Sequence, residues 1–341
     1  MQNGTPLRSG TFKEPNPYLH EDVIAIEPVF GEELLFEVHW LLTRRCSFSC
    51  SYCPPHRHNN RSPQVDEVTL IGGLERLDGI LSDRIFRINL TGGEPTIYPA
   101  FLSFINHTTT LSSIKAVRIV TNLSGPDRVW SGLRKIAATK PGHIQVVASF
   151  HSEQADPLSF VERIQFLLES GIQVVTKFMV AISNLDLLRK LMPTLSGLTD
   201  AYSHFSVAVQ CVRDLGMDVD NELEMLGRTY LNNISHWYDQ RSIIVSSKKG
   251  LRCESLGNID DLIRSGKNSF KGWTCDAGLR AFFIDTDGSV FSAGCKPESL
   301  PLFYLFDEAS EPSKLQSVIC PHSICECAST IRIPKRASER S

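Results

Sequence analysis

The sequence predicts an α/β fold of parallel strands joined by helices. Short runs rich in β-branched residues recur along the chain, stretches with helical periodicity separate them, and the spacing falls to about 30 residues in the middle. A strand, a helix and a second strand in succession indicate a parallel crossover unit. About six such units predict a partial barrel or a doubly wound sheet, and periodicity alone does not choose between them.

The expected strands follow one another along the first two thirds of the chain. Each is a short apolar run, and the helical stretch at 157–171 closes on Gly171, a common residue at helix ends. The predicted strands are 36–43, 84–93, 116–122, 144–151, 172–180 and 204–212.

This rhythm divides the chain into four parts. The first is polar and rich in Pro and Gly, so we expect it to be loose, and the last holds five of the ten cysteines. The four parts are an N-terminal arm (1–35), a strand–helix core (36–215), a helical connection (216–269) and a cysteine-rich extension (270–335).

The amino-acid composition argues against several classes of protein. The chain has 341 residues, 42% of them hydrophobic and 21% charged, with a net charge of −3, which argues against a protein that mainly grips nucleic acid. No apolar run approaches the roughly 20 residues of a membrane span, and the N-terminus lacks the apolar centre of a signal peptide. Ten cysteines without an export signal favour metal binding or redox chemistry in the cytoplasm.

Three cysteines crowd the end of the first predicted strand. Cys46, Cys50 and Cys53 have the spacing C-x3-C-x2-C, which is compact for one zinc ion but suits three adjacent irons of a cubane. Functional groups of α/β folds lie at the carboxyl ends of strands. The fourth iron would then stay open for another ligand. A zinc knuckle or three unrelated buried thiols is the alternative.

The stretch TRRCSFSCSYC resembles the cluster loop of the radical S-adenosylmethionine (radical SAM) superfamily, whose fold is a partial (β/α)6 barrel. The resemblance implies that Cys46, Cys50 and Cys53 hold a [4Fe–4S] cluster and that S-adenosylmethionine chelates the open iron. Reductive cleavage of that cofactor gives a 5′-deoxyadenosyl radical, which abstracts a hydrogen atom from the substrate. Tyr52 is implied beside the adenine, and Ser47 stands where many members have Asn.

A second motif, LTGGEP, ends the second predicted strand. Gly92 and Gly93 allow close backbone approach to a ligand, Glu94 offers a carboxylate, and Pro95 ends strand pairing. The motif resembles the GGEP of radical SAM enzymes, which binds the amino group of the cofactor. By itself it is also an ordinary strand-to-helix turn.

Later strand ends carry weaker matches to the same family. The resemblance implies cofactor contacts for residues at the third, fourth and fifth strands, although each can equally cap a helix or meet water. These residues are Thr121 with Asn122, Ser149 with His151, and Lys177.

The five cysteines of the extension predict a metal site built from two segments. AFFI and SVF flank an Asp-Thr-Asp-Gly turn in which Gly288 supplies positive φ, so a hairpin is expected to bring Cys275 and Cys295 together. The segment CPHSICEC adds Cys320, Cys325 and Cys327.

This pattern resembles the twitch or SPASM-like extension of radical SAM enzymes, which binds an auxiliary [4Fe–4S] cluster. Six residues separate Gly288 from Cys295 where four are usual, and five cysteines exceed the four positions of one cluster. A zinc ribbon is the alternative, because zinc accepts the same ligands.

Two further cysteines, Cys211 and Cys253, are either buried apolar thiols or a hydrogen-atom donor to a substrate radical, as in related epimerases. The resemblance implies a small molecule or short peptide as substrate and a reductase, flavodoxin or ferredoxin as electron donor. A non-catalytic metal-binding interaction protein is the rival interpretation, although such a protein needs no GGEP carboxylate.

Overall fold

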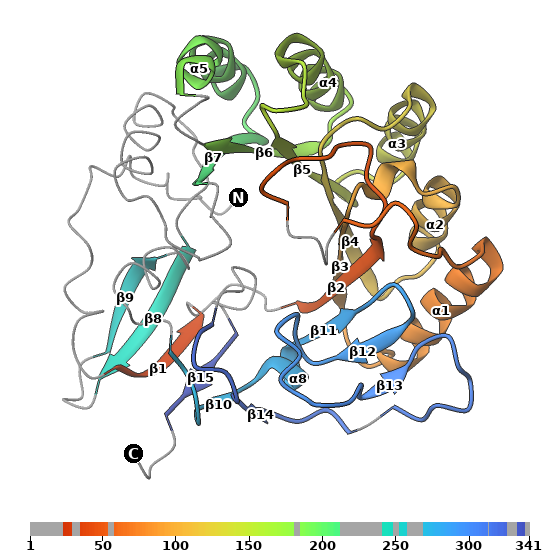
Figure 1. Cartoon of the computed structure of the whole chain (residues 1–341), viewed down its shortest axis with the longest axis vertical. Helices are drawn as coiled ribbons and strands as arrows, with labels where there is room; N and C mark the ends of the chain where they lie inside the picture. The colour runs from red at the N-terminus through yellow and green to blue at the C-terminus, as the bar shows by residue number, and fades with distance from the viewer. Residues whose placement is uncertain are drawn as a thin grey trace, which may run out of the picture.

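A curved, mainly parallel sheet lies at the centre of the fold, with helices along its outer face (Figure 1). All six expected strands form, and each pairs in parallel with the next along the chain. The expected α/β fold is confirmed. The strands are β2 (Phe36–Thr43), β3 (Phe86–Gly92), β4 (Ile114–Thr121), β5 (Ile144–Phe150), β6 (Gln173–Val180) and β7 (Phe205–Cys211).

This description comes from a computed structural model. The residues that it describes are 23–28, 35–53, 58–180, 185–211, 241–247, 252–257, 269–312, 314–325 and 333–337.

The helices between these strands begin and end as the sequence indicates. In α4, Asp156 caps the first turn by accepting from the amide of Ser159 at 2.8 Å, and Gly171 adopts φ +72 just after the end. The expected helix at 157–171 is thus confirmed. The helices are α1 (Glu67–Ile80), α2 (Phe101–Thr108), α3 (Asp127–Thr139), α4 (Pro157–Glu169) and α5 (Leu185–Ala201), with the short 3-10 helix η2 (Pro95–Ile97) after β3.

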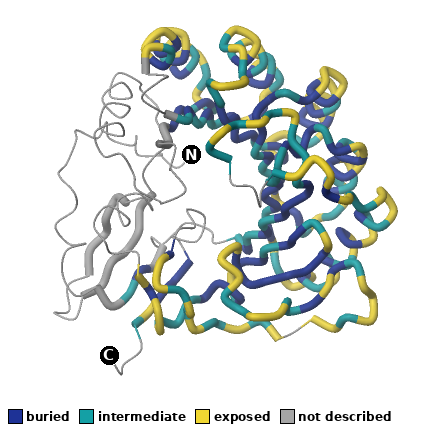
Figure 2. Tube along the Cα trace, in the orientation of Figure 1, coloured by how far each residue is buried: buried dark blue, intermediate teal, exposed yellow. Residues whose placement is uncertain are grey.

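The core lies between the sheet and the helices, where the strands are dark blue in Figure 2. Side chains alternate across each strand, so every second residue of β2 faces the helices. Trp40, for example, is buried and meets the ring of Phe104 of α2 edge-on at 5.2 Å. The opposite, inner face of the sheet carries the more exposed positions and leads to the strand ends.

The expected hairpin of the extension forms and joins the same sheet. β11 (Ala281–Ile284) and β12 (Ser289–Phe291) are antiparallel, β13 (Phe303–Tyr304) follows, and Gly288 adopts φ +81 in the turn. β11 pairs in parallel with β2, which gives a nine-stranded sheet. Phe282 packs on Phe36 at 5.0 Å, so the hairpin shares the core of the barrel.

A second, six-stranded sheet corrects two expectations. β1 (Val23–Pro28) lies in the part expected to be a loose arm, and β8 (Arg241–Ser247) and β9 (Arg252–Gly257) lie in the expected helical connection. β1 pairs with β8, and the apolar β-branched runs in both favour a strand. The other members are β10 (Thr274–Cys275), β14 (Val318–Ile319) and β15 (Lys335–Arg336), and a short helix, α8 (Ala277–Arg280), leads from β10 to β11.

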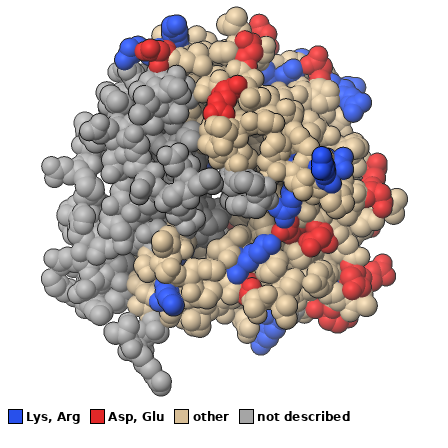
Figure 3. Space-filling model, viewed as in Figure 1, with Lys and Arg blue, Asp and Glu red and all other residues tan. Residues whose placement is uncertain are grey.

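Charges of both signs are interspersed over the described face in Figure 3, in keeping with the near-neutral net charge. Within the described residues, no helix has the length and apolar character needed to cross a membrane.

Candidate active site

The loop with the first three cysteines leaves the carboxyl end of β2 and is fixed at its base. The carbonyl oxygen of Arg44 accepts from the amide of Asn59 at 2.8 Å, and the amide of Cys46 donates to Asn60 Oδ1 at 2.8 Å. The guanidinium of Arg45 donates to the carbonyl of Ser62, also at 2.8 Å. These bonds tie residues 44–46 to residues 59–62 at the carboxyl end of β2.

The three thiols are close enough to influence one another. Burial, followed by the negative charges of Glu94, Cys50 and Cys53, raises the pKa of Cys46 to about 11. Burial is also the largest cause of the raised pKa of Cys50. Metal-free Cys46 and Cys50 are therefore neutral at pH 7, and a metal that binds them must displace their protons.

The glycines after β3 seat this loop against the sheet. The amide of Gly93 donates to the carbonyl of Thr43, and the amide of Glu94 donates to that of Arg45, both at 2.8 Å. A Cβ on Gly92 would overlap the Thr43 carbonyl oxygen, and one on Gly93 would overlap that of Arg45. The close approach expected toward a ligand is therefore, in this structure, an approach to the cluster loop itself.

Glu94 is fully buried and joins the ends of two strands. Burial raises its pKa, while the hydrogen bonds that it accepts favour the carboxylate. Its side chain thereby links β3, η2 and the end of β4. The donors are the amide of Thr96 at 3.0 Å, the hydroxyls of Thr96 and Thr121, and the amide of Asn122 at 2.6 Å.

Asn122 carries this link to the first cysteine. Its side-chain amide lies 3.7 Å from the sulfur of Cys46 and 3.5 Å from the hydroxyl of Ser47, and Ser47 also contacts Ser124. Ser47, which stands where many family members have Asn, thus hydrogen-bonds to the end of β4. The structure places Glu94 and Asn122 beside the cluster loop. The hydrogen bonds that it shows for both side chains are to other residues of the protein.

The end of β5 holds the other side of the loop. The hydroxyl of Tyr52 lies 2.7 Å from Nδ1 of His151, and the two rings stack at 5.9 Å. Glu153 accepts from the amide and the hydroxyl of Ser51, at 2.7 and 2.6 Å. Burial lowers the pKa of His151 to about 4, so its imidazole is neutral at pH 7. Sequence reasoning missed Glu153, which belongs to no motif.

Ser149 and Lys177 lie directly opposite each other on the neighbouring strands β5 and β6. Ser149 is buried, and Lys177 is partly exposed. The register therefore places these two expected cofactor contacts together near the carboxyl ends of the strands. Their contacts with a cofactor stay a prediction.

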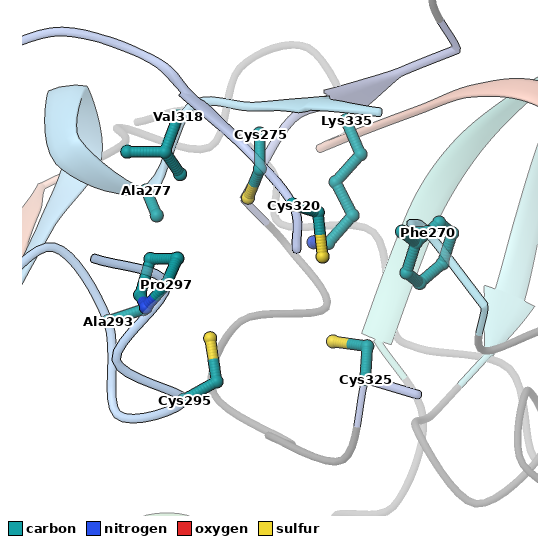
Figure 4. Close-up of a pocket in the computed structure, with 10 residues that line it drawn as sticks. All are labelled: Phe270, Cys275, Ala277, Ala293, Cys295, Pro297, Val318, Cys320, Cys325 and Lys335. Carbon is teal, nitrogen blue, oxygen red and sulfur yellow. The ribbon is translucent and has the colours of Figure 1, made fainter. Parts of the chain in front are cut away.

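Four C-terminal cysteines surround one pocket (Figure 4). Cys275 belongs to β10, Cys320 directly follows β14, which pairs with β10, and Cys295 follows β12. Together with Cys325, their sulfur atoms point into the same space. The expected proximity of Cys275 and Cys295 is confirmed, and Cys327 lies outside the described residues.

Within the described ranges, no group of three or more His, Cys, Asp or Glu side chains is arranged to hold a metal ion. The four sulfurs instead line the wall of the pocket. A single zinc ion draws its sulfurs to about 2.3 Å, whereas in a cubane each thiolate binds a different iron.

A buried lysine lies in the same pocket. Lys335 stands opposite Cys275 in the strand register, is 2% exposed and donates to the carbonyl of Ile333 at 2.8 Å. Its ammonium also lies 5.6 Å from the centre of the Phe270 ring. Burial raises the pKa of Cys275, and the charge of Lys335 acts in the opposite direction. The pocket thus offers a positive charge to ionised sulfur.

The backbone places the last two cysteines in different parts of the fold. Cys211 ends β7, at the carboxyl edge of the barrel, whereas Cys253 pairs with Val245 in the second sheet. Their side chains lie outside what the structure describes, so a hydrogen-donating role stays a prediction for both.

Replacing Glu94 by Gln is expected to lower the free energy of unfolding by about 1–3 kcal/mol, because an amide cannot accept from all of these donors. Urea unfolding of metal-free protein measures the loss. Glu169→Gln, at an exposed position of α4, is the matched control. Equal losses in the two variants would contradict the role of Glu94 as a link between strands.

The cluster loop is expected to loosen in acid. Burial holds the pKa of His151 below its usual 6.5, so its stabilising contribution is present above pH 6.5 and is lost as pH falls toward 4. Hydrogen exchange at residues 46–53, corrected for its intrinsic pH dependence, should accelerate over this range, and His151→Gln should remove the acceleration. His143, whose pKa is also lowered to about 4, bonds to Thr108 and serves as the control. Retention of the effect in His151→Gln would refute the assignment.

Comparisons with known proteins agree with this geometry. Residues 40–187 match the model of the Radical SAM superfamily. A 111-residue stretch is 31% identical to molybdenum cofactor biosynthesis protein 1 of Bos taurus, and 92 residues are 34% identical to GTP 3′,8-cyclase of Heliobacterium modesticaldum. These matches cover 32% and 25% of this chain but only 18% and 27% of the two relatives.

Solved structures resemble the chain over a longer range. Streptococcus suis SuiB bound to its precursor peptide SuiA has a TM-score of 0.55 at 14% identity, over 81% of this chain and 63% of that one. Native anSMEcpe with bound AdoMet has a TM-score of 0.50 at 14% identity, over 80% and 78%. At this identity the likeness concerns the fold. Residues 40–187 of the chain therefore form a domain that matches the Radical SAM superfamily.

Proposed function

We propose that this protein binds a [4Fe–4S] cluster through Cys46, Cys50 and Cys53 and abstracts a hydrogen atom from a small-molecule or peptide substrate. One observation carries the proposal. The loop with these three thiols is seated on the glycines of the GGEP motif, at the carboxyl end of a parallel barrel.

The residues present fit such a cluster and S-adenosylmethionine. Three soft thiols lie in one short loop, and the amide of Asn122 faces the sulfur of Cys46. When bound, the cluster supplies an electron that cleaves S-adenosylmethionine to a 5′-deoxyadenosyl radical. The hydrogen bonds described above hold the loop in place, and His151 fixes the ring of Tyr52 within it. These contacts would help to orient the reactants.

A second [4Fe–4S] cluster is the proposed occupant of the C-terminal pocket. The four sulfurs around it come from separate segments, and the buried ammonium of Lys335 compensates part of the negative charge that four thiolates bring. Cys327 is then the spare cysteine or a replacement for one of the four. A zinc ribbon is the alternative, because zinc accepts the same four thiolates.

The substrate class is proposed from the relatives and from the inner face of the sheet. The name of the relative GTP 3′,8-cyclase includes a nucleotide, and SuiB was solved bound to a peptide. On the inner face, Arg87 pairs with Glu37, whose carboxylate also accepts from Asn89 at 2.7 Å. These polar groups suit a polar small molecule or a short peptide.

The electron donor is proposed to be a reductase, flavodoxin or ferredoxin. The thiol-rich composition fits the reducing cytoplasm.

Anaerobically reconstituted protein is expected to hold about eight irons per chain, because each cubane contains four. The triple variant with Cys46, Cys50 and Cys53 replaced by Ala should keep about half, and Cys253→Ala should keep all of them. With dithionite, wild-type protein should convert S-adenosylmethionine to 5′-deoxyadenosine, and the triple variant should not. Iron and zinc analysis with chromatography of the products measures both.

About four irons with one zinc per chain would identify the C-terminal site as a zinc ribbon. An iron-replete wild-type protein that forms no 5′-deoxyadenosine would overturn the proposed activity.

A further inference from the structure

Asp285, the first residue after β11, is a buried carboxylate that meets two cations. The guanidinium of Arg44 pairs with Oδ1, and the ammonium of Lys296 lies 2.8 Å from Oδ2. The amide of Thr286 also donates to Oδ1 at 2.7 Å. Burial raises the pKa of Asp285, but these cations and hydrogen bonds outweigh it and the pKa is lowered. Asp285 is therefore ionised at pH 7.

The two cations come from the two cysteine loops. Arg44 lies two residues before Cys46, at the closed base of the cluster loop. Lys296 directly follows Cys295, which lines the C-terminal pocket. A single carboxylate thus bridges loops that lie 252 residues apart, counted from Arg44 to Lys296.

The backbone next to Cys295 is held in an unusual conformation. Lys296 has φ +48, in the left-handed region that residues other than glycine rarely adopt. A strained backbone of this kind persists only where surrounding contacts fix it. Its ammonium lies 4.6 Å from the ring centre of Phe291 and 5.8 Å from that of Phe283, in addition to its pair with Asp285. These contacts determine where the chain leaves Cys295.

We propose that Asp285 is a positioning residue that couples the two cysteine sites, because with Arg44 and Lys296 it fixes the Cys295 loop relative to the loop of Cys46. The inference rests on the proposed function for its metal sites, although the bridge itself consists of protein atoms. Without the carboxylate, Arg44 and Lys296 lose their shared counter-ion, and the contact that joins the two loops is lost. Both loops are then expected to loosen together.

Asp285→Asn tests this coupling while keeping the shape of the turn. Asp287→Asn is the matched control, because Asp287 lies in the same turn and accepts from the amide and hydroxyl of Ser289 at 3.0 and 2.6 Å. In metal-free protein, Asp285→Asn should accelerate hydrogen exchange on the order of tenfold both at 44–46 and at 293–297. Asp287→Asn should leave both segments unchanged.

A remote effect separates coupling from local damage. Lys296→Met removes only the cation beside Cys295, yet it should accelerate exchange at 44–46 in the wild-type background and have no further effect in Asp285→Asn. In iron-loaded protein, Lys296→Met should likewise change the electron paramagnetic resonance spectrum of the cluster at Cys46. Asp285→Asn should abolish that dependence.

Exchange that accelerates only at 284–289 in Asp285→Asn would overturn the coupling and leave Asp285 as a turn residue. A cluster spectrum that does not respond to Lys296→Met would overturn it as well. A protein that shows coupled exchange but takes up no iron would establish the bridge and refute the proposed function. The two claims therefore fail in different measurements.

Discussion

The backbone pairing between the cluster loop and the residues after β3 is the constraint on which the rest of the site depends. The amides of Gly93 and Glu94 donate to the carbonyls of the residues before and after Arg44. Only glycine at positions 92 and 93 lets the two segments approach this closely. Since β2 and β3 are neighbours in the sheet, this pairing extends their contact beyond the last strand residues. The loop of Cys46 is thereby placed over the end of the barrel.

Further contacts then surround the loop from successive strands. Glu94 and Asn122 connect it to β4, and His151 and Glu153 connect it to β5. β11 pairs with the opposite edge of β2, which brings Asp285 to Arg44. The loop of Cys46, which follows β2, and the loop of Cys295, which follows β12, thus meet at Asp285.

Much of this architecture could be predicted from local sequence. Cysteine spacing, the GGEP motif and the alternation of strands and helices each occupy a short window, and the hairpin at Gly288 has its own turn signal. The predictions of a loose arm and of a helical connection were wrong where β1, β8 and β9 form. A short strand depends on partners far along the chain, which a local pattern does not reveal.

Glu153 and Asp285 escaped sequence reasoning for a related reason. Ser51 and Glu153 are 102 residues apart, and Arg44 and Asp285 are 241 apart. A single acidic residue carries no local signature of such a partner. The fold has to be known before either contact can be recognised.

The central claim is that S-adenosylmethionine binds at an iron held by Cys46, Cys50 and Cys53. Electron paramagnetic resonance of the dithionite-reduced protein, recorded before and after addition of S-adenosylmethionine, tests it most directly. The account predicts that the signal of one cluster changes in wild-type protein and that this signal is missing when the three cysteines are replaced by Ala. An iron-replete protein whose spectrum is the same with and without S-adenosylmethionine would contradict it.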